Sequence, residues 1–108
     1  MKGLTLAVTD MSAMTRFYSD VFGIEFQSTK VGGFELYRGE WLGIDLLFCP
    51  AALARNNATQ NRHQFDIVVQ DLAETKTKIE KAGGIVFDAT ETSLSVYDPD
   101  RNSIVFSL

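Results

Sequence analysis

The segment Leu4-Thr5-Leu6-Ala7-Val8-Thr9-Asp10 decides the fold of this protein, because a related segment occurs a second time in the chain. The counterpart, which begins at Phe65, is Phe65-Asp66-Ile67-Val68-Val69-Gln70-Asp71. In both segments apolar residues alternate with smaller or more polar ones, which is typical of a half-buried β-strand. Each segment ends on an aspartate, a residue that often caps the start of a helix.

The similarity between the two halves continues beyond these strands. Gly23-Ile24-Glu25-Phe26 corresponds to Gly84-Ile85-Val86-Phe87, and Ile44-Asp45-Leu46 corresponds to Ile104-Val105-Phe106. Three blocks in the same order indicate two copies of one supersecondary unit.

Each copy is predicted to form one strand, one helix and three further strands. The first helix follows Asp10, carries apolar residues at helical spacing and ends at Gly23. The second begins with Asp71 and Glu74 as a capping box and extends to about Ala82, before Gly83-Gly84. The remaining strands are expected near residues 24–30, 33–38 and 42–48 in the first copy, and near 85–88, 92–97 and 103–108 in the second.

The fold class is therefore α+β, with two tandem βαβββ modules in one domain covering residues 1–108. The modules are expected at about 1–49 and 62–108, and the polar stretch of about 50–61 is interpreted as their linker. The helices should cover one face of each four-stranded sheet, which leaves the other face to line a cleft.

Composition excludes several classes of partner and location. The net charge is −4, and the 10 Lys and Arg residues are scattered, so neither nucleic acid nor an anionic membrane surface is an expected partner. No apolar run approaches the roughly 20 residues that span a bilayer. The N-terminus lacks the apolar segment of a signal peptide, and the single cysteine, Cys49, cannot form an internal disulfide. We expect a cytoplasmic protein.

Four short motifs, in phase with the repeat, resemble the vicinal-oxygen-chelate superfamily of glyoxalases, bleomycin-resistance proteins and extradiol dioxygenases. They are Val8-Thr9-Asp10, Phe17-Tyr18, Val21-Phe22-Gly23-Ile24, and Asp98-Pro99-Asp100-Arg101-Asn102, which stands in place of the family's Asp-Pro-Asp-Gly turn. The resemblance covers nearly the whole chain. It implies a curved, incompletely closed eight-stranded barrel around a cleft, and a homodimer in which the partner completes the clefts.

Metal-dependent members of that superfamily take ligands from four strand positions, and the resemblance places these positions at Gly3, Asp45, Gln64 and Val105. Glycine and valine have no donor side chain. One carboxylate and one amide are too few for Zn²⁺, Ni²⁺ or Fe²⁺. His63, the only histidine, is next to Gln64 and therefore belongs to the opposite face of the strand. We expect no metal and no cofactor.

The same resemblance predicts which side chains face the cleft and contact a ligand. On the third strand of each copy, Glu35 and Tyr37, and Ser93, Ser95 and Tyr97, are expected to face inward. The predicted ligand-binding residues are Asp45, Gln64, Asp66, Tyr37, Trp41, Leu47, Ser103 and Val105. Polar groups among apolar and aromatic ones are typical of a small-molecule pocket.

Three functions fit these residues. The leading hypothesis is a metal-independent small-molecule binding protein of the glyoxalase and bleomycin-resistance type, because sequestration requires affinity and no reactive group. The alternative is a lyase- or isomerase-like enzyme with Asp45 or Asp66 as general base. The third is a structural or regulatory subunit whose cleft is empty.

Overall fold

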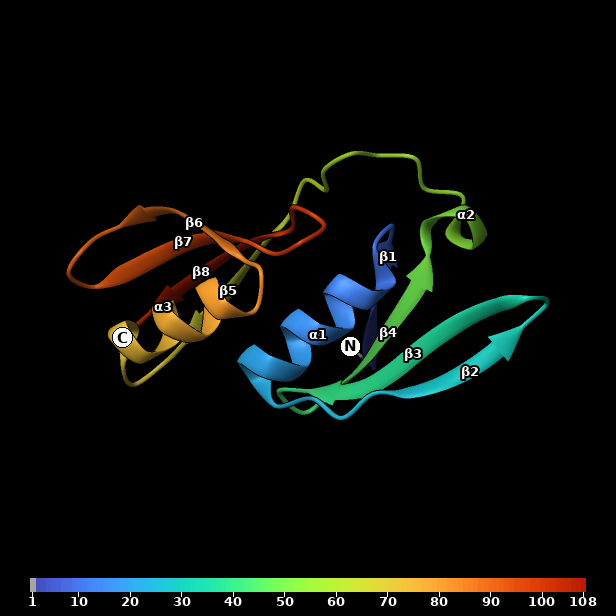
Figure 1. Ribbon diagram of the computed structural model, residues 1–108, viewed down its shortest axis with the longest axis horizontal. Helices are drawn as coiled ribbons and strands as arrows, with labels where there is room; N and C mark the ends of the chain where they lie inside the picture. The colour runs from blue at the N-terminus through green and yellow to red at the C-terminus, as the bar shows by residue number, and fades with distance from the viewer. Residues whose placement is uncertain (1) are drawn as a thin grey trace. The chain divides into compact units, whose positions relative to one another are not determined.

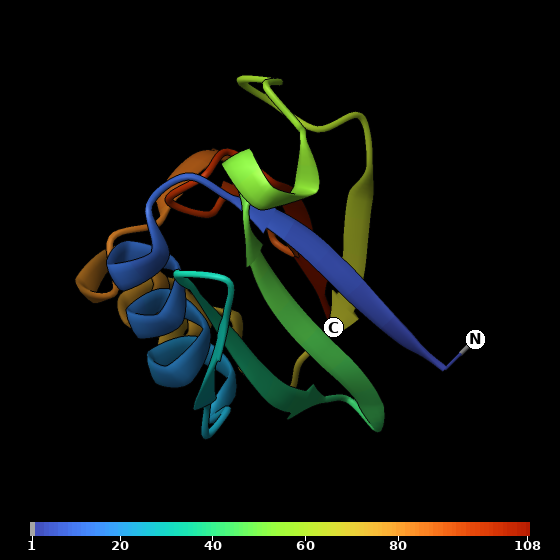
Figure 2. The same cartoon turned by 90° about the vertical axis from the view of Figure 1, so that its right-hand side faces the viewer.

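The computed structural model describes residues 2–108 of the chain. These residues form two compact units, one that ends at Ala58 and one that starts at Thr59, and each unit holds one copy of the repeat. Figures 1 and 2 show one long helix beside the sheet of each unit.

The first unit contains a four-stranded sheet in the order β1-β4-β3-β2. Strands β1 and β4 are parallel, and the other neighbouring strands are antiparallel. Its elements are β1 (Gly3–Val8), α1 (Met11–Phe22), β2 (Gln27–Val31), β3 (Phe34–Trp41), β4 (Ile44–Pro50) and the short helix α2 (Ala51–Ala54).

Helix α1 begins and ends where the local sequence predicts. The Asp10 side chain accepts a hydrogen bond from the backbone N–H of Ala13 at 3.1 Å. Gly23 adopts the left-handed conformation, with φ of 71°, and its N–H donates to the Ser19 carbonyl at 2.9 Å. A side chain at Gly23 would strain this helix end, which is why glycine is suited to it.

The core of the first unit lies between α1 and one face of the sheet. Tyr18 of α1 is fully buried, and its ring meets Phe48 edge-on with 5.2 Å between the ring centroids. Leu6, Leu46 and Phe48 are buried on this face, whereas Asp45 is exposed. The alternation along β1 and β4 therefore directs the apolar residues to the helix, as predicted.

The second unit has the corresponding sheet, in the order β5-β8-β7-β6, with β5 and β8 parallel. Asp71 caps its helix by accepting from the Glu74 N–H at 3.0 Å. Ile67 and Ile79 are buried in its core. The elements are β5 (Gln64–Val68), α3 (Leu72–Lys81), β6 (Ile85–Ala89), β7 (Ser93–Tyr97) and β8 (Ser103–Ser107).

The turn between β7 and β8 is built on a buried carboxylate. The Asp98 side chain accepts hydrogen bonds from the N–H groups of Asp100 and Asn102, each at 2.9 Å, and from the Asn102 amide at 2.8 Å. Asn102 in turn accepts from the Asn61 amide at 2.8 Å. Arg101, where the family has glycine, has a φ of 67°. The predicted turn is confirmed, and it determines where β8 begins.

The α+β fold with two tandem βαβββ modules is confirmed. Each sheet is open, because β1 and β2 are the edges of the first and β5 and β6 the edges of the second. The segment interpreted as a linker contains helix α2, which the sequence did not predict. No helix within residues 2–108 is long and apolar enough to cross a membrane.

The strand pairing corrects the predicted correspondence between β4 and β8. Gly3 pairs with Asp45 in the first sheet, and Gln64 pairs with Ser103 in the second. The equivalent of Asp45 is therefore Ser103 rather than Val105, two residues earlier. Because two residues are one strand period, Val105 still lies on the predicted face.

Candidate functional site

In each unit the helix covers one face of the sheet, and the opposite face, here called the open face, carries most of the predicted site residues. On the second sheet, Gln64 is opposite Ser103, and Val105 has Asp66 on one side and Ser95 on the other. The apolar residues between them, such as Ile104, are buried against the other face. The open face of the second sheet comprises Gln64, Asp66, Val68, Ser93, Ser95, Tyr97, Ser103, Val105 and Ser107.

Two direct contacts organise this open face. The Gln64 amide donates a hydrogen bond to an Asp66 carboxylate oxygen at 2.9 Å, so the two side chains form one polar group. The rings of Tyr97 and Phe87 are stacked, with 4.4 Å between their centroids and 25° between their planes. Val68 is 78% exposed. Hydrogen-bonding groups, a ring stack and uncovered apolar surface thus occur on the same sheet.

Sequence reasoning did not find Phe87. The pairing of β6 with β7 shifts between Val86 and Asp88, which is a bulge at Phe87. A bulge interrupts the strand alternation and can re-aim a side chain. Because Ile85 is opposite Tyr97, alternation already puts Phe87, two residues later, on the face of Tyr97, and the sequence lacked only the pairing of β6 with β7.

The open face of the first sheet carries Asp45 and Leu47, as predicted, together with Arg38 and Glu40 of β3. Arg38 is opposite Leu47, and Glu40 is opposite Asp45. Asp45 and Glu40 are both exposed, and like charges directly opposite each other on a sheet destabilise it modestly.

The predictions that Tyr37 and Trp41 share the open face with Asp45 are wrong. Tyr37 is opposite Phe48, and Trp41 is opposite Ile44, so both lie on the helix side, as does Glu35. Trp41 is 3% exposed, and its ring is 5.4 Å from that of Tyr18. The pairing of β3 with β4 and the packing of α1 decide which face of β3 each side chain occupies. Burial of the Trp41 indole under α1 stabilises the observed orientation.

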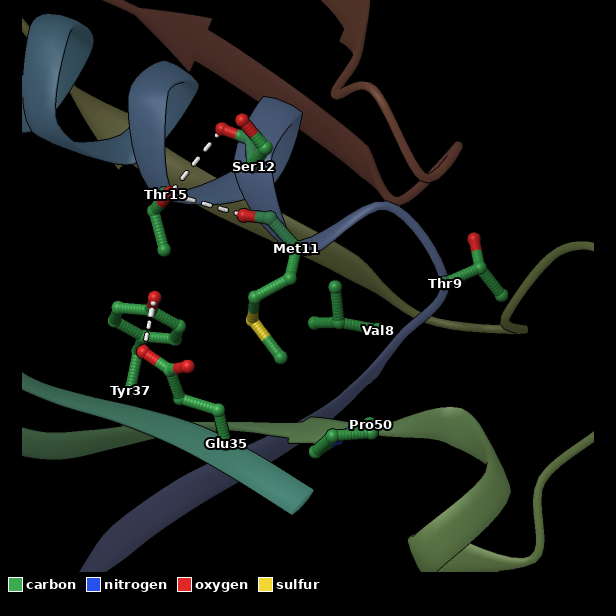
Figure 3. A pocket seen from close by; sticks show the side chains of 8 residues that line it. All are labelled: Val8, Thr9, Met11, Ser12, Thr15, Glu35, Tyr37 and Pro50. Atoms are coloured by element: carbon green, nitrogen blue, oxygen red, sulfur yellow. Dashed lines mark hydrogen bonds between the residues drawn. The ribbon is translucent and has the colours of Figure 1, made fainter. Parts of the chain in front are cut away.

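Tyr37 instead lines a groove on the helix side of the first sheet, which we call the α1 groove (Figure 3). The groove has a volume of about 370 Å³. The Tyr37 hydroxyl donates a hydrogen bond to a Glu35 carboxylate oxygen at 2.7 Å, and this bond raises the pKa of Tyr37 above its ordinary value. The lining residues are Val8, Thr9, Met11, Ser12, Thr15, Glu35, Tyr37 and Pro50.

The positions that correspond to the superfamily's metal ligands offer few donors. A Cβ on Gly3 would lie 2.7 Å from the backbone oxygen of Asp45, so a donor side chain does not fit there without movement of the strands. The fourth position, which the strand pairing moves from Val105 to Ser103, offers only a serine hydroxyl, which is not among the usual ligands of these metals. Among residues 2–108, no three His, Cys, Asp or Glu side chains are grouped so that they could hold a metal ion. This donor set does not fit a transition metal.

His63, the only histidine of the chain, does not occupy any of the four positions that correspond to metal ligands. Its ring contacts Phe65, at 4.5 Å between ring centroids, and Phe65 belongs to the helix side of β5. Its Nε2 atom is buried without a hydrogen-bond partner within the described part of the chain. His63, which directly precedes β5, is thus on the side opposite Gln64, as expected from its position next to that residue.

Comparison with known proteins identifies the architecture. The family model of the glyoxalase-like domain matches residues 3–106. No protein of curated function matches this sequence. FosX, a fosfomycin resistance protein from Mesorhizobium loti, has a similar structure with a TM-score of 0.81 and 15% identity, over 99% of this chain and 89% of that one.

Two further solved structures have the same fold. A glyoxalase-related enzyme from Fulvimarina pelagi has a TM-score of 0.76 and 18% identity, over 99% of this chain and 86% of that one. Lactoylglutathione lyase from Agrobacterium tumefaciens has a TM-score of 0.68 and 24% identity, over 99% of this chain and 91% of that one. At these identities the likeness concerns the fold and carries no activity over to this chain.

Proposed function

This chain belongs to the glyoxalase-like family of the vicinal-oxygen-chelate superfamily, and we propose that it acts there as a metal-independent small-molecule binding protein. The ligand lies against the open face of a sheet. The solved structures described above are named as enzymes and as a resistance protein, and none of these names describes a metal-independent binding protein, so the proposal rests on the residues of this chain.

The observation that supports this proposal most is the joined Gln64–Asp66 pair on the open face of the second sheet. The hydrogen bond of 2.9 Å between them leaves acceptor capacity on Asp66 and a second amide hydrogen on Gln64. The Tyr97–Phe87 stack supplies a flat apolar surface on the same sheet. A few oriented polar groups beside aromatic surface are what a small-molecule site requires.

The proposed ligand contacts are those predicted residues that lie on the open faces, with the ring stack in place of Tyr37 and Trp41. Asp45 and Asp66 are both exposed, which favours a role in binding over a role as a desolvated general base. On the first sheet these contacts are Asp45 and Leu47, and on the second sheet they are Gln64, Asp66, Ser103, Val105, Tyr97 and Phe87.

The proposed metal independence rests on the residue types at the four strand positions that correspond to the superfamily's metal ligands. Gly3 has no donor, and the strand pairing puts Ser103, a weak hydroxyl donor, at the fourth position in place of Val105, so Asp45 and Gln64 are the only strong donors of the set. We expect the purified protein to carry no stoichiometric Zn, Ni, Fe or Mn. Elemental analysis that finds about one such metal per chain, lost when Asp45 and Gln64 are both replaced, would contradict this expectation.

We also propose that the protein is a homodimer. Large apolar side chains are uncovered on the second unit, with Val68 78% and Ile85 59% exposed, and a partner chain would remove them from water. Light scattering at micromolar concentration should give twice the mass of the chain, 12.0 kDa. A single species of monomer mass would refute the proposal.

The binding function is tested first by thermal-shift screening against metabolites and antibiotics, since a ligand of the native state raises the unfolding temperature. For a ligand so found, Asp66→Asn and Asp45→Asn should each weaken binding by roughly 1–3 kcal/mol if the ligand donates hydrogen bonds to them or is cationic. Glu80→Gln, on the exposed side of α3, is the matched control. Binding that none of the open-face substitutions changes would refute this site.

A further inference from the structure

The α1 groove is separate from the proposed ligand site, since it lies on the helix side of the first sheet. Helix α1 forms one wall with Met11, Ser12 and Thr15, and β3 forms the other with Glu35 and Tyr37 (Figure 3). All of its lining residues come from the first unit. Its volume, about 370 Å³, is within the range of small-molecule pockets.

The groove combines an apolar interior with one charge. The Met11 side chain extends into its middle, with Val8 and Pro50 nearby (Figure 3). Glu35 supplies the negative charge, and the hydrogen bond from Tyr37 holds one of its oxygens in place. Of the eight described residues that line the groove, none is basic, so no lining side chain neutralises this carboxylate.

These groups match one class of ligand. A carboxylate attracts a positive charge, and the tyrosine ring beside it provides a π-face on which an ammonium group is stabilised. The polarisable thioether of Met11 and the side chains of Val8 and Pro50 suit short alkyl groups. An anion would be repelled by Glu35. The partial positive charge at the start of α1 is already balanced by the Asp10 cap.

We propose that the α1 groove binds a small organic cation, an alkylammonium group, with its charge between the Glu35 carboxylate and the Tyr37 ring. The side chain that would compete with the ligand's positive charge for Glu35 is Lys30, the cross-strand partner of Glu35 on the exposed edge strand β2. Lys30 therefore provides an independent test, because its removal should favour the ligand.

The experiment uses choline as the probe and, as a neutral control, the analogue in which carbon replaces the ammonium nitrogen. Backbone amide NMR spectra of the whole protein are recorded during titration into the millimolar range. Choline should cause saturable shifts at Val8, Thr9, Ser12 and Thr15, and the neutral analogue should not.

Four variants test the residues. Glu35→Gln should weaken choline binding about fivefold, the scale of an exposed cation–π or charged contact. Lys30→Gln should strengthen it. Glu40→Gln, which removes the same charge from the opposite face of β3, should leave it unchanged, as should Glu80→Gln in the other unit. Because Glu35 is exposed, Glu35→Gln should fold normally, which its thermal unfolding checks.

Several results would overturn this proposal. They are equal binding of choline and its neutral analogue, equal effects of Glu35→Gln and Glu40→Gln, shifts confined to the open faces, or no saturable shifts. Shifts at the open faces that Asp66→Asn abolishes would support the proposed function while refuting the α1 groove as a site.

Discussion

Replacement of Asp98 with alanine should destabilise the second unit more than any surface substitution in it. Asp98 is 1% exposed, and its carboxylate accepts three hydrogen bonds, from two backbone N–H groups and the Asn102 side chain. Alanine leaves these donors without their acceptor, and Asn102 is itself fully buried. At about 1–1.5 kcal/mol for each bond, the free energy of unfolding should fall by about 3–4.5 kcal/mol.

Urea unfolding of the wild type and the variant, followed by circular dichroism, measures this loss. Asp98→Asn keeps the shape and one acceptor oxygen, so its cost should be about half as large. Asp88→Ala is the matched control, because Asp88 is exposed on the edge strand β6, and its cost should stay within about 0.5 kcal/mol. If Asp98→Ala costs no more than Asp88→Ala, the turn does not depend on the buried carboxylate.

Three further predictions follow from backbone conformation, strand alternation and the Glu35–Tyr37 contact. Arg101→Gly should raise the free energy of unfolding by about 1 kcal/mol, because glycine adopts a φ of 67° without strain, and a loss of stability would contradict this. Ile67→Ala should cost about 2–4 kcal/mol because Ile67 is buried, whereas Val68→Ala should cost less than about 0.5 kcal/mol, and equal costs would contradict the assigned faces of β5. The pKa of Tyr37 should lie above 10.0, and Glu35→Gln should lower it toward that value in an NMR titration of the tyrosine rings. Because the folded-state pKa is the raised one, the stability from this contact is present below pH 10.0 and is lost as the pH rises through the folded-state pKa, and a Tyr37 pKa that Glu35→Gln does not change would contradict the assignment.

The sequence by itself determined the two modules and the elements within them, because the interactions that define these elements are local. Asp10 and Asp71 cap helices that begin one residue later, and Gly23 ends α1 through its own backbone conformation. The faces of β1, β4, β5 and β8 could be read because buried apolar residues alternate with exposed or polar ones along them. The lack of a donor at the first metal position also required only the residue type, which is glycine at Gly3.

Only the tertiary structure decided three features: which residues of β3 face the helix, the bulge at Phe87, and the register in which β8 pairs with β5. Both faces of β3 carry large apolar or aromatic as well as charged residues, so alternation gives no answer until α1 covers Trp41. The ring stack of Phe87 and Tyr97 depends on the pairing of β6 with β7, which one strand cannot show without its partner. Pairing is non-local, because the register of β8 depends on the β7–β8 turn and the position of β5. The α1 groove has the same origin, since it exists only where Met11 and Tyr37, far apart in sequence, come together.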